Sequence, residues 1–164
     1  MNQQNQLILA AASALVLLVL FKGDTMKIKG LRNNNPGNLR GSNSFTWQGE
    51  IGRDKDGFVI FDKPENGIRA MYKTLGTYRN NYQGLSGVGG KGFDTVHEII
   101  NRWAPQVEND TSSYISHVAS VLNLNPFQPV PLDRYPDLIK VIIRHENGTQ
   151  PYSDKVIYDG IAAA

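Results

Sequence analysis

The chain has 164 residues, of which 17 are Lys or Arg and 15 are Asp or Glu, and it contains no cysteine. This length favours a single domain of ordinary size, and a net charge of +2 is too small to indicate a nucleic-acid partner. Without cysteine the chain has no disulfides, no thiolate zinc site and no cysteine nucleophile.

The first predicted element is an N-terminal membrane helix from Leu7 to Phe21, inside an anchor and linker that cover residues 1–26. The segment has no charge and one polar residue, Ser13, and as a helix it would span only about 22 Å of a hydrocarbon core roughly 30 Å thick. A cleaved signal peptide is the alternative, but it would have a basic start and a small-residue exit. Basic residues follow the segment and none precedes it. The positive-inside rule therefore predicts a single-pass protein of a virion membrane or of the host inner membrane, with its domain on the inner side.

The remaining residues, 27–164, are predicted to form one mainly α domain of the α+β class. Asn, Gly and Arg dominate residues 26–40, which is typical of an ordered loop. Two β-prone runs, 45–51 and 58–61, flank Asp56-Gly57 and predict a small β-hairpin with these two residues in its turn.

Four helices are expected along the rest of the chain, and the glycine-rich stretch 84–92 is expected to be a flexible loop. Each helix has apolar residues at helical spacing and a recognisable start, such as an early Pro or a capping box. The helices are expected over about fifteen residues from Asp62, over 95–104, from Asp110 or Thr111 to Leu122, and from Pro136 to the residue before Gly148.

The last of these helices contains the candidate catalytic residue, Glu146. The apolar stripe of the helix includes Ile142 and Ile143, and Glu146 continues it at positions i+4 and i+3. Partial burial and the negative end of the helix dipole both favour the protonated form of a carboxyl, which suits a general acid. The alternative is an exposed acid at a frayed helix end.

Other motifs are weaker indications of a site. Glu65 lies in the first turn of its helix, where capping explains it. Asp54-x-Asp56 resembles the start of a calcium loop, but Phe58 and Val59 stand where an oxygen ligand and a glycine are needed. The three histidines are dispersed. We therefore expect no metal site, and nothing in the sequence implies a cofactor.

Three segments resemble cell-wall enzymes. Residues 138–148 read Leu-Ile-x-x-Ile-Ile-Arg-His-Glu-Asn-Gly, which is similar to the motif of lytic transglycosylases of the lysozyme superfamily, where an apolar helix ends in the catalytic Glu. Residues 30–40, with their Asn-Asn-Asn-Pro-Gly-Asn core, resemble phage virion proteins and a loop of peptidoglycan glucosaminidases. Residues 108–118 resemble a segment that floors the glycan groove of transglycosylases. Because the catalytic helix comes first in those enzymes and last here, the resemblance implies a circularly permuted lysozyme-like domain.

The resemblance also implies roles for individual residues. Glu146 would be the acid and base that cleaves the bond between N-acetylmuramic acid and N-acetylglucosamine. Asn38, Tyr114 and Tyr152 would contact sugars, and Trp47 would line the groove. For Trp47 and Tyr114 core packing is the alternative, because large aromatic side chains usually supply buried area.

The sequence leaves open whether such an enzyme is a transglycosylase or a muramidase. A hydrolase needs a second carboxylate at a suitable distance, whereas a transglycosylase does not. The candidates for a second carboxylate are Glu50, Asp54 and Asp62.

Taken together, these patterns predict a phage protein that cleaves peptidoglycan glycan strands during cell-wall penetration or lysis. Its expected partners are peptidoglycan, a lipid membrane through Leu7 to Phe21, and other virion proteins. One alternative is a non-catalytic virion membrane or structural protein that binds peptidoglycan. The other is a secreted bacterial enzyme that remodels the wall.

Overall fold

The computed structural model describes residues 28–105 and 110–164. This part of the chain combines helices with one two-stranded antiparallel sheet, which confirms the predicted α+β class. None of its helices has the length and apolar character needed to cross a bilayer, and the predicted anchor, Leu7 to Phe21, lies outside the described residues. The elements are α2 (Lys29–Arg32), β1 (Glu50–Arg53), β2 (Val59–Phe61), α3 (Pro64–Asn81), α4 (Val96–Trp103), α5 (Thr111–Leu122), the short 3-10 helix η1 (Leu132–Arg134), α6 (Tyr135–Asn147) and α7 (Asp154–Ala162).

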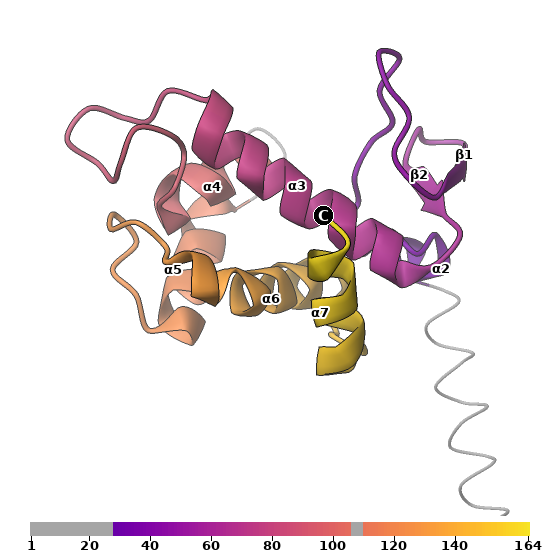
Figure 1. Ribbon diagram of the computed structural model, residues 1–164. Helices are drawn as coiled ribbons and strands as arrows, with labels where there is room; N and C mark the ends of the chain where they lie inside the picture. The colour runs from indigo at the N-terminus through magenta and orange to yellow at the C-terminus, as the bar shows by residue number, and fades with distance from the viewer. Residues whose placement is uncertain (1–27, 106–109) are drawn as a thin grey trace, which may run out of the picture.

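Helix α6 is the central element, with contacts to α2, α3, α5 and α7 (Figure 1). The apolar stripe predicted for it is confirmed, since Leu138, Ile139, Ile142 and Ile143 are fully buried. Burying one such side chain contributes about 1.5–3 kcal/mol. The stripe therefore fixes the orientation of α6, and with it the direction in which the end of the helix presents its polar residues.

The helix ends follow most of the capping signals in the sequence. The predicted capping box of α4 is confirmed, because Thr95 and Glu98 each accept a hydrogen bond from the other's backbone N–H. Asp110 caps α5 by accepting a hydrogen bond from the N–H of Ser113. Gly148, with φ at +69°, ends α6 in the left-handed conformation that glycine adopts without strain.

The start of α3 differs from the prediction. The N-cap position is taken by Lys63, which makes no side-chain cap, and the helix runs for 18 residues rather than about fifteen. Asp62, from which the helix was expected to start, instead accepts a hydrogen bond of 2.7 Å from the side chain of Asn66. Its carboxylate thus stabilises the first turn from the side and does not cap the helix end.

The predicted hairpin is confirmed, although its first strand begins later, at Glu50 instead of residue 45. The turn is built around Asp54, whose Oδ1 accepts hydrogen bonds from the N–H groups of Asp56 at 3.0 Å and Phe58 at 2.9 Å. Gly57 follows with φ at +84°, which agrees with its predicted place in the turn.

Three helical elements were not predicted, and one of them is the three-residue η1. The four residues of α2 lie inside the stretch expected to be a loop. Helix α7 begins after Ser153, whose hydroxyl accepts a hydrogen bond from the N–H of Val156, and it packs along α3. This contact is close, because a Cβ at Gly160 would lie 2.8 Å from the carbonyl oxygen of Glu65. The helix spans only nine residues, which is too short for its periodicity to be a clear signal.

Candidate active site

The asparagine-rich loop after α2 ties the hairpin to the rest of the domain through its side chains. Asn35 is fully buried, and its Nδ2 donates hydrogen bonds to the carbonyl oxygens of Leu39 at 2.8 Å and Val59 at 2.9 Å. Its Oδ1 accepts a hydrogen bond from the N–H of Leu39 at 2.9 Å. Asn34 and Asn38 both have φ at +50°, a conformation that asparagine tolerates better than most residues. The loop is therefore held in one shape, and it brings Asn38 to the end of α6.

The half-buried carboxylate of Glu146 lies where this loop meets α6. It accepts hydrogen bonds from three neutral donors: Asn38 Nδ2 at 3.1 Å, the indole Nε1 of Trp103 at 3.2 Å and the phenol of Tyr114 at 3.5 Å. A neighbouring cation would favour the ionised form of a carboxyl, but none forms an ion pair with Glu146 in the described part of the chain. The carboxylate is thus held in place by neutral hydrogen-bond donors.

The residue that follows Glu146 locks the helix end onto the loop. Asn147 is buried and donates hydrogen bonds to the carbonyl oxygens of Pro36 at 2.7 Å and Ile143 at 2.9 Å. The approach depends on Gly30 of α2, because a Cβ there would lie 2.3 Å from the Oδ1 of Asn147. The end of α6 is thus packed against residues 30–36, which lie more than 100 positions earlier in the chain.

Tyr114 is placed behind Glu146 and is itself only 1% exposed. Its ring stacks on His145, with 3.4 Å between centroids and 9° between planes. Burial raises the pKa of the Tyr114 phenol well above its usual range, and the charge and hydrogen bond of Glu146 act in the same direction. The phenol is therefore a permanent neutral donor, and it holds the carboxylate instead of contacting a ligand in the open cleft.

Glu146 lines a cleft of about 780 Å³ between the hairpin side of the molecule and the ends of α3 and α4. A concave site with apolar walls and a few converging polar groups is the usual form of a ligand-binding site. Asn38 and Trp47, two of the predicted substrate contacts, both line it. The aromatic part of the lining consists of Phe45, Trp47, Phe58, Tyr78, Tyr82 and Trp103.

The ring of Trp47 packs against its neighbours, but its indole N–H has no hydrogen-bond partner among the described residues. Its ring is half-buried and meets the ring of Phe45 edge-on, with 4.9 Å between centroids. The indole Nε1 is buried, and no acceptor for it occurs among the described residues. A buried donor at the wall of a cleft is suited to a hydroxyl or amide oxygen of a ligand.

The predicted second carboxylates do not line the cleft. Glu50 accepts a hydrogen bond from the N–H of Trp47 at 3.0 Å and pairs with Arg53 at 3.1 Å. Asp54 builds the hairpin turn: desolvation raises its pKa, but hydrogen bonds from the Phe58 backbone and the Asn33 side chain outweigh this and lower it. None of the three candidates, Glu50, Asp54 and Asp62, borders the cavity. Across residues 28–105 and 110–164, no three His, Asp or Glu side chains come close enough together to hold a metal ion.

Tyr152 does not reach the cleft either. It is half-buried against the main apolar core and is not part of the cavity lining. Burial, with a smaller contribution from the charge of Glu65, raises the pKa of its phenol to about 12. The position after the catalytic-helix motif therefore belongs to core packing.

Replacing Tyr152 with Phe should reduce the loss of stability at alkaline pH. A phenol whose pKa is higher in the folded than in the unfolded chain stabilises the fold below the unfolded value of about 10. That contribution is lost as the pH rises from 10 towards 12. Urea unfolding at pH 8, 10, 11 and 12 should show a shallower decline for Tyr152→Phe than for the wild type. An identical decline in the two proteins would contradict the assignment.

Trp103 is the contact to Glu146 that the sequence did not indicate. Its apolar spacing in α4 predicts a core residue, and part of the ring does pack on the core. The indole N–H, however, donates to Glu146. Close packing fixes the ring, because a Cβ at Gly37 would lie 2.9 Å from Cζ2 of Trp103. The sequence pattern is the same for a Trp that only packs in the core and for a Trp that also donates a hydrogen bond. The role of Trp103 as a donor is therefore visible only from its contact with Glu146 in the structure.

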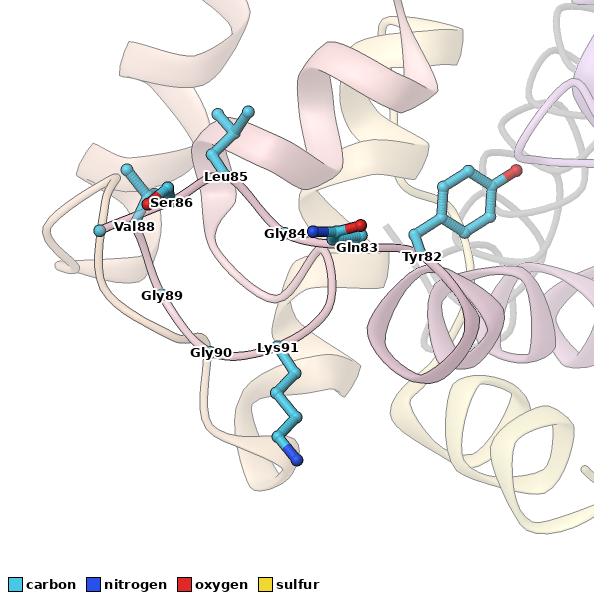
Figure 2. A pocket seen from close by; sticks show the side chains of 10 residues that line it. Tyr82, Gln83, Gly84, Leu85, Ser86, Val88, Gly89, Gly90 and Lys91 are labelled. Atoms are coloured by element: carbon cyan, nitrogen blue, oxygen red, sulfur yellow. The ribbon is translucent and has the colours of Figure 1, made fainter.

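A second hollow, of about 530 Å³, lies within the glycine-rich loop between α3 and α4 (Figure 2). Its lining runs from Tyr82 to Lys91 and consists largely of backbone, while the Tyr82 ring points away from the loop. The base of the loop is anchored by the buried Glu98, which accepts a hydrogen bond from the N–H of Leu85 at 2.8 Å. The lining of this hollow contains no carboxylate and no histidine, so the cleft at Glu146 is the candidate site.

Comparison with known proteins gives one clear similarity. No protein-family model matches the chain. The chain is 37% identical over 155 residues to Protein P5 of Pseudoalteromonas phage PM2, and the alignment covers 93% of this chain and 91% of that protein. An identity of this level over nearly the whole length of both chains indicates common descent and a shared fold.

Proposed function

We propose that this phage protein, which belongs to the same family as Protein P5 of Pseudoalteromonas phage PM2, cleaves the glycan strands of peptidoglycan as a lytic transglycosylase. The observation that carries this proposal is the half-buried carboxylate of Glu146 in a cleft lined by aromatic side chains. The resemblance of its helix to the catalytic helix of lysozyme-like enzymes supports the same conclusion. On this proposal the fold is a circularly permuted member of that superfamily.

The chemistry needs one group that gives and then takes a proton. Glu146 in its acid form protonates the glycosidic oxygen as the bond from that oxygen to the anomeric carbon of muramic acid breaks. The resulting carboxylate takes the proton of the muramic 6-hydroxyl, whose oxygen forms the new bond to the anomeric carbon. No water is consumed, and the products are a 1,6-anhydro end and a new 4-hydroxyl. The residue returns to its acid form.

Asn38 suits both protonation states of Glu146. Its Nδ2 donates to the carboxylate, while its Oδ1 is buried and has no partner among the described residues. Rotation of the amide by half a turn exchanges the two atoms, so the same side chain can accept a hydrogen bond from the protonated acid. The pair can thus remain hydrogen-bonded through the catalytic cycle.

Transglycosylation is favoured over hydrolysis by the charges at the site. In a hydrolase a second carboxylate activates water or attacks the sugar at about 5 to 9.5 Å from the acid. Glu146 is the only acid among the described residues of the cleft lining, and Glu50 and Asp54 are occupied by structural hydrogen bonds. A single acid is sufficient for the intramolecular attack.

The setting of the enzyme follows from the N-terminal segment. We infer that Leu7 to Phe21 anchors the protein in the membrane of a phage particle or of the host, and that the domain acts during wall penetration or lysis. The apolar, uncharged composition of the segment supports this placement.

The product of the reaction tests the proposal. The full chain, kept in detergent, should release muropeptides with 1,6-anhydro ends from purified peptidoglycan, as detected by mass spectrometry. Reducing ends would instead identify a muramidase and would require a second carboxylate in the cleft. Sedimentation of the protein with intact, unshortened strands would favour the non-catalytic peptidoglycan-binding alternative and overturn the proposal.

A further inference from the structure

The cleft around Glu146 is positively charged. Its described lining contains three basic side chains, Lys29, Arg40 and Arg102, against the single acid. Arg40 comes from the asparagine-rich loop beside the hairpin, and Arg102 comes from the last turn of α4. The hairpin and α4 lie near opposite ends of α3 (Figure 1). Positive charge therefore enters the cleft from two separate parts of the fold.

The two arginines are held mainly by aromatic rings and not by carboxylates. The guanidinium of Arg40 lies 4.4 Å from the centroid of the Phe58 ring and donates a hydrogen bond of 2.7 Å to the backbone carbonyl of Asp56. That of Arg102 lies 5.5 Å from the Tyr82 ring and donates to the Tyr82 hydroxyl at 3.3 Å. Neither forms an ion pair within the described part of the chain.

This arrangement leaves the charges available to a ligand. Both arginines are exposed, and stacking on a ring orients a guanidinium without neutralising it. A guanidinium presents paired N–H donors in a geometry that matches a carboxylate. Charges at the walls of a concave, partly desolvated site also act more strongly than charges on an open surface.

We propose that Arg40 and Arg102 bind carboxylates of the stem peptides, so that the enzyme selects glycan strands whose peptides are acidic over strands whose peptides are amidated. The inference rests on the proposed glycan cleavage. In a strand that carries peptides the lactyl carboxyl of each muramic acid is bound in an amide bond, so the peptides supply the carboxylates, whereas a stripped strand exposes the lactyl carboxylate itself. Lys29 adds to the field of the cleft but is partly compensated by Asp56 at 3.8 Å.

The test compares kcat/KM of the full chain in detergent on three substrates: strands with acidic stem peptides, the same strands with amidated carboxylates, and strands stripped of peptides. The wild type should prefer the acidic over the amidated strands, and added salt should weaken this preference. Arg40→Gln and Arg102→Gln should each lower the ratio of kcat/KM for acidic over amidated strands by about tenfold, a typical effect of losing one charge-assisted hydrogen bond. The control Lys73→Gln, an exposed residue of α3 outside the cleft lining, should keep the wild-type ratio.

Each of four other outcomes would contradict either the proposed function or the role of the two arginines. If the wild type cleaves none of the substrates, the proposed function itself fails. If it cleaves all three equally and the arginine variants keep that pattern, only the selection of acidic peptides fails. Equal cleavage of acidic and amidated strands, both faster than stripped strands, shows that peptide bulk, and not charge, is recognised. If Lys73→Gln lowers the ratio as much as the arginine variants, general surface charge is responsible.

Discussion

Replacing Glu146 with Gln is expected to lower the rate of glycan cleavage by at least about 10³-fold, because one side chain both supplies and accepts the proton. The variant should remain folded. The amide oxygen of Gln can accept the hydrogen bonds now donated by Trp103 and Tyr114. Its NH₂ group can donate to the Oδ1 of Asn38 after that amide rotates, and this oxygen has no partner among the described residues at present.

The measurement is the release of muropeptides from purified peptidoglycan by wild-type and variant chains, with urea unfolding as the check on folding. The unfolding midpoint should change by no more than about 0.5 M. Glu65→Gln is the matched control, because this acid lies at the start of α3 and not in the cleft lining. Activity that survives in Glu146→Gln but is lost in Glu65→Gln would move the site to Glu65.

Replacing Asn35 with Ala is expected to destabilise the domain by roughly 3 kcal/mol. The substitution removes the three hydrogen bonds that Asn35 makes to Leu39 and Val59. Each is worth about 1 kcal/mol, and the partners would be left buried without replacements. With a urea dependence near 2 kcal/mol per molar, the unfolding midpoint should fall by about 1.5 M.

Asn80→Ala provides the comparison for this experiment. Asn80 is exposed on α3, so its replacement by a better helix former should leave the midpoint unchanged or raise it slightly. A loss below about 0.5 M for Asn35→Ala would mean that water replaces the missing amide. The loop would then be held by its backbone and not by its side chains.

Much of the secondary structure was predictable because its signals are local. The stripe of α6, the glycine that ends it, the capping box of α4 and the turn of the hairpin each occupy fewer than about fifteen residues. Helix α7 is equally local but too short for a clear period, and it is stabilised mainly by packing on α3. The contact with α3 therefore stabilises α7, although its sequence pattern alone does not predict a helix.

The surroundings of Glu146 were predictable only in part. Asn38 lies 108 residues away along the chain, and no periodicity joins them; the resemblance to lysozyme-like enzymes was what linked the two. The same resemblance placed Tyr152 among the sugar contacts, whereas the structure puts its ring against the core. Trp103 was missed because its ring carbons pack on the core while its N–H donates a hydrogen bond. The apolar pattern of the sequence indicates only the packing.

One geometric consequence concerns distance from the membrane. Lys29 of α2 lines the cleft, and only seven residues of the sequence separate it from Phe21, the end of the proposed anchor. Fully extended, that connection reaches about 28 Å. On the proposed function, an enzyme with so short a tether would cut only strands that touch its own bilayer. The position of the membrane, in the phage particle or in the host, would then determine where the wall is opened, and diffusion of the enzyme would not.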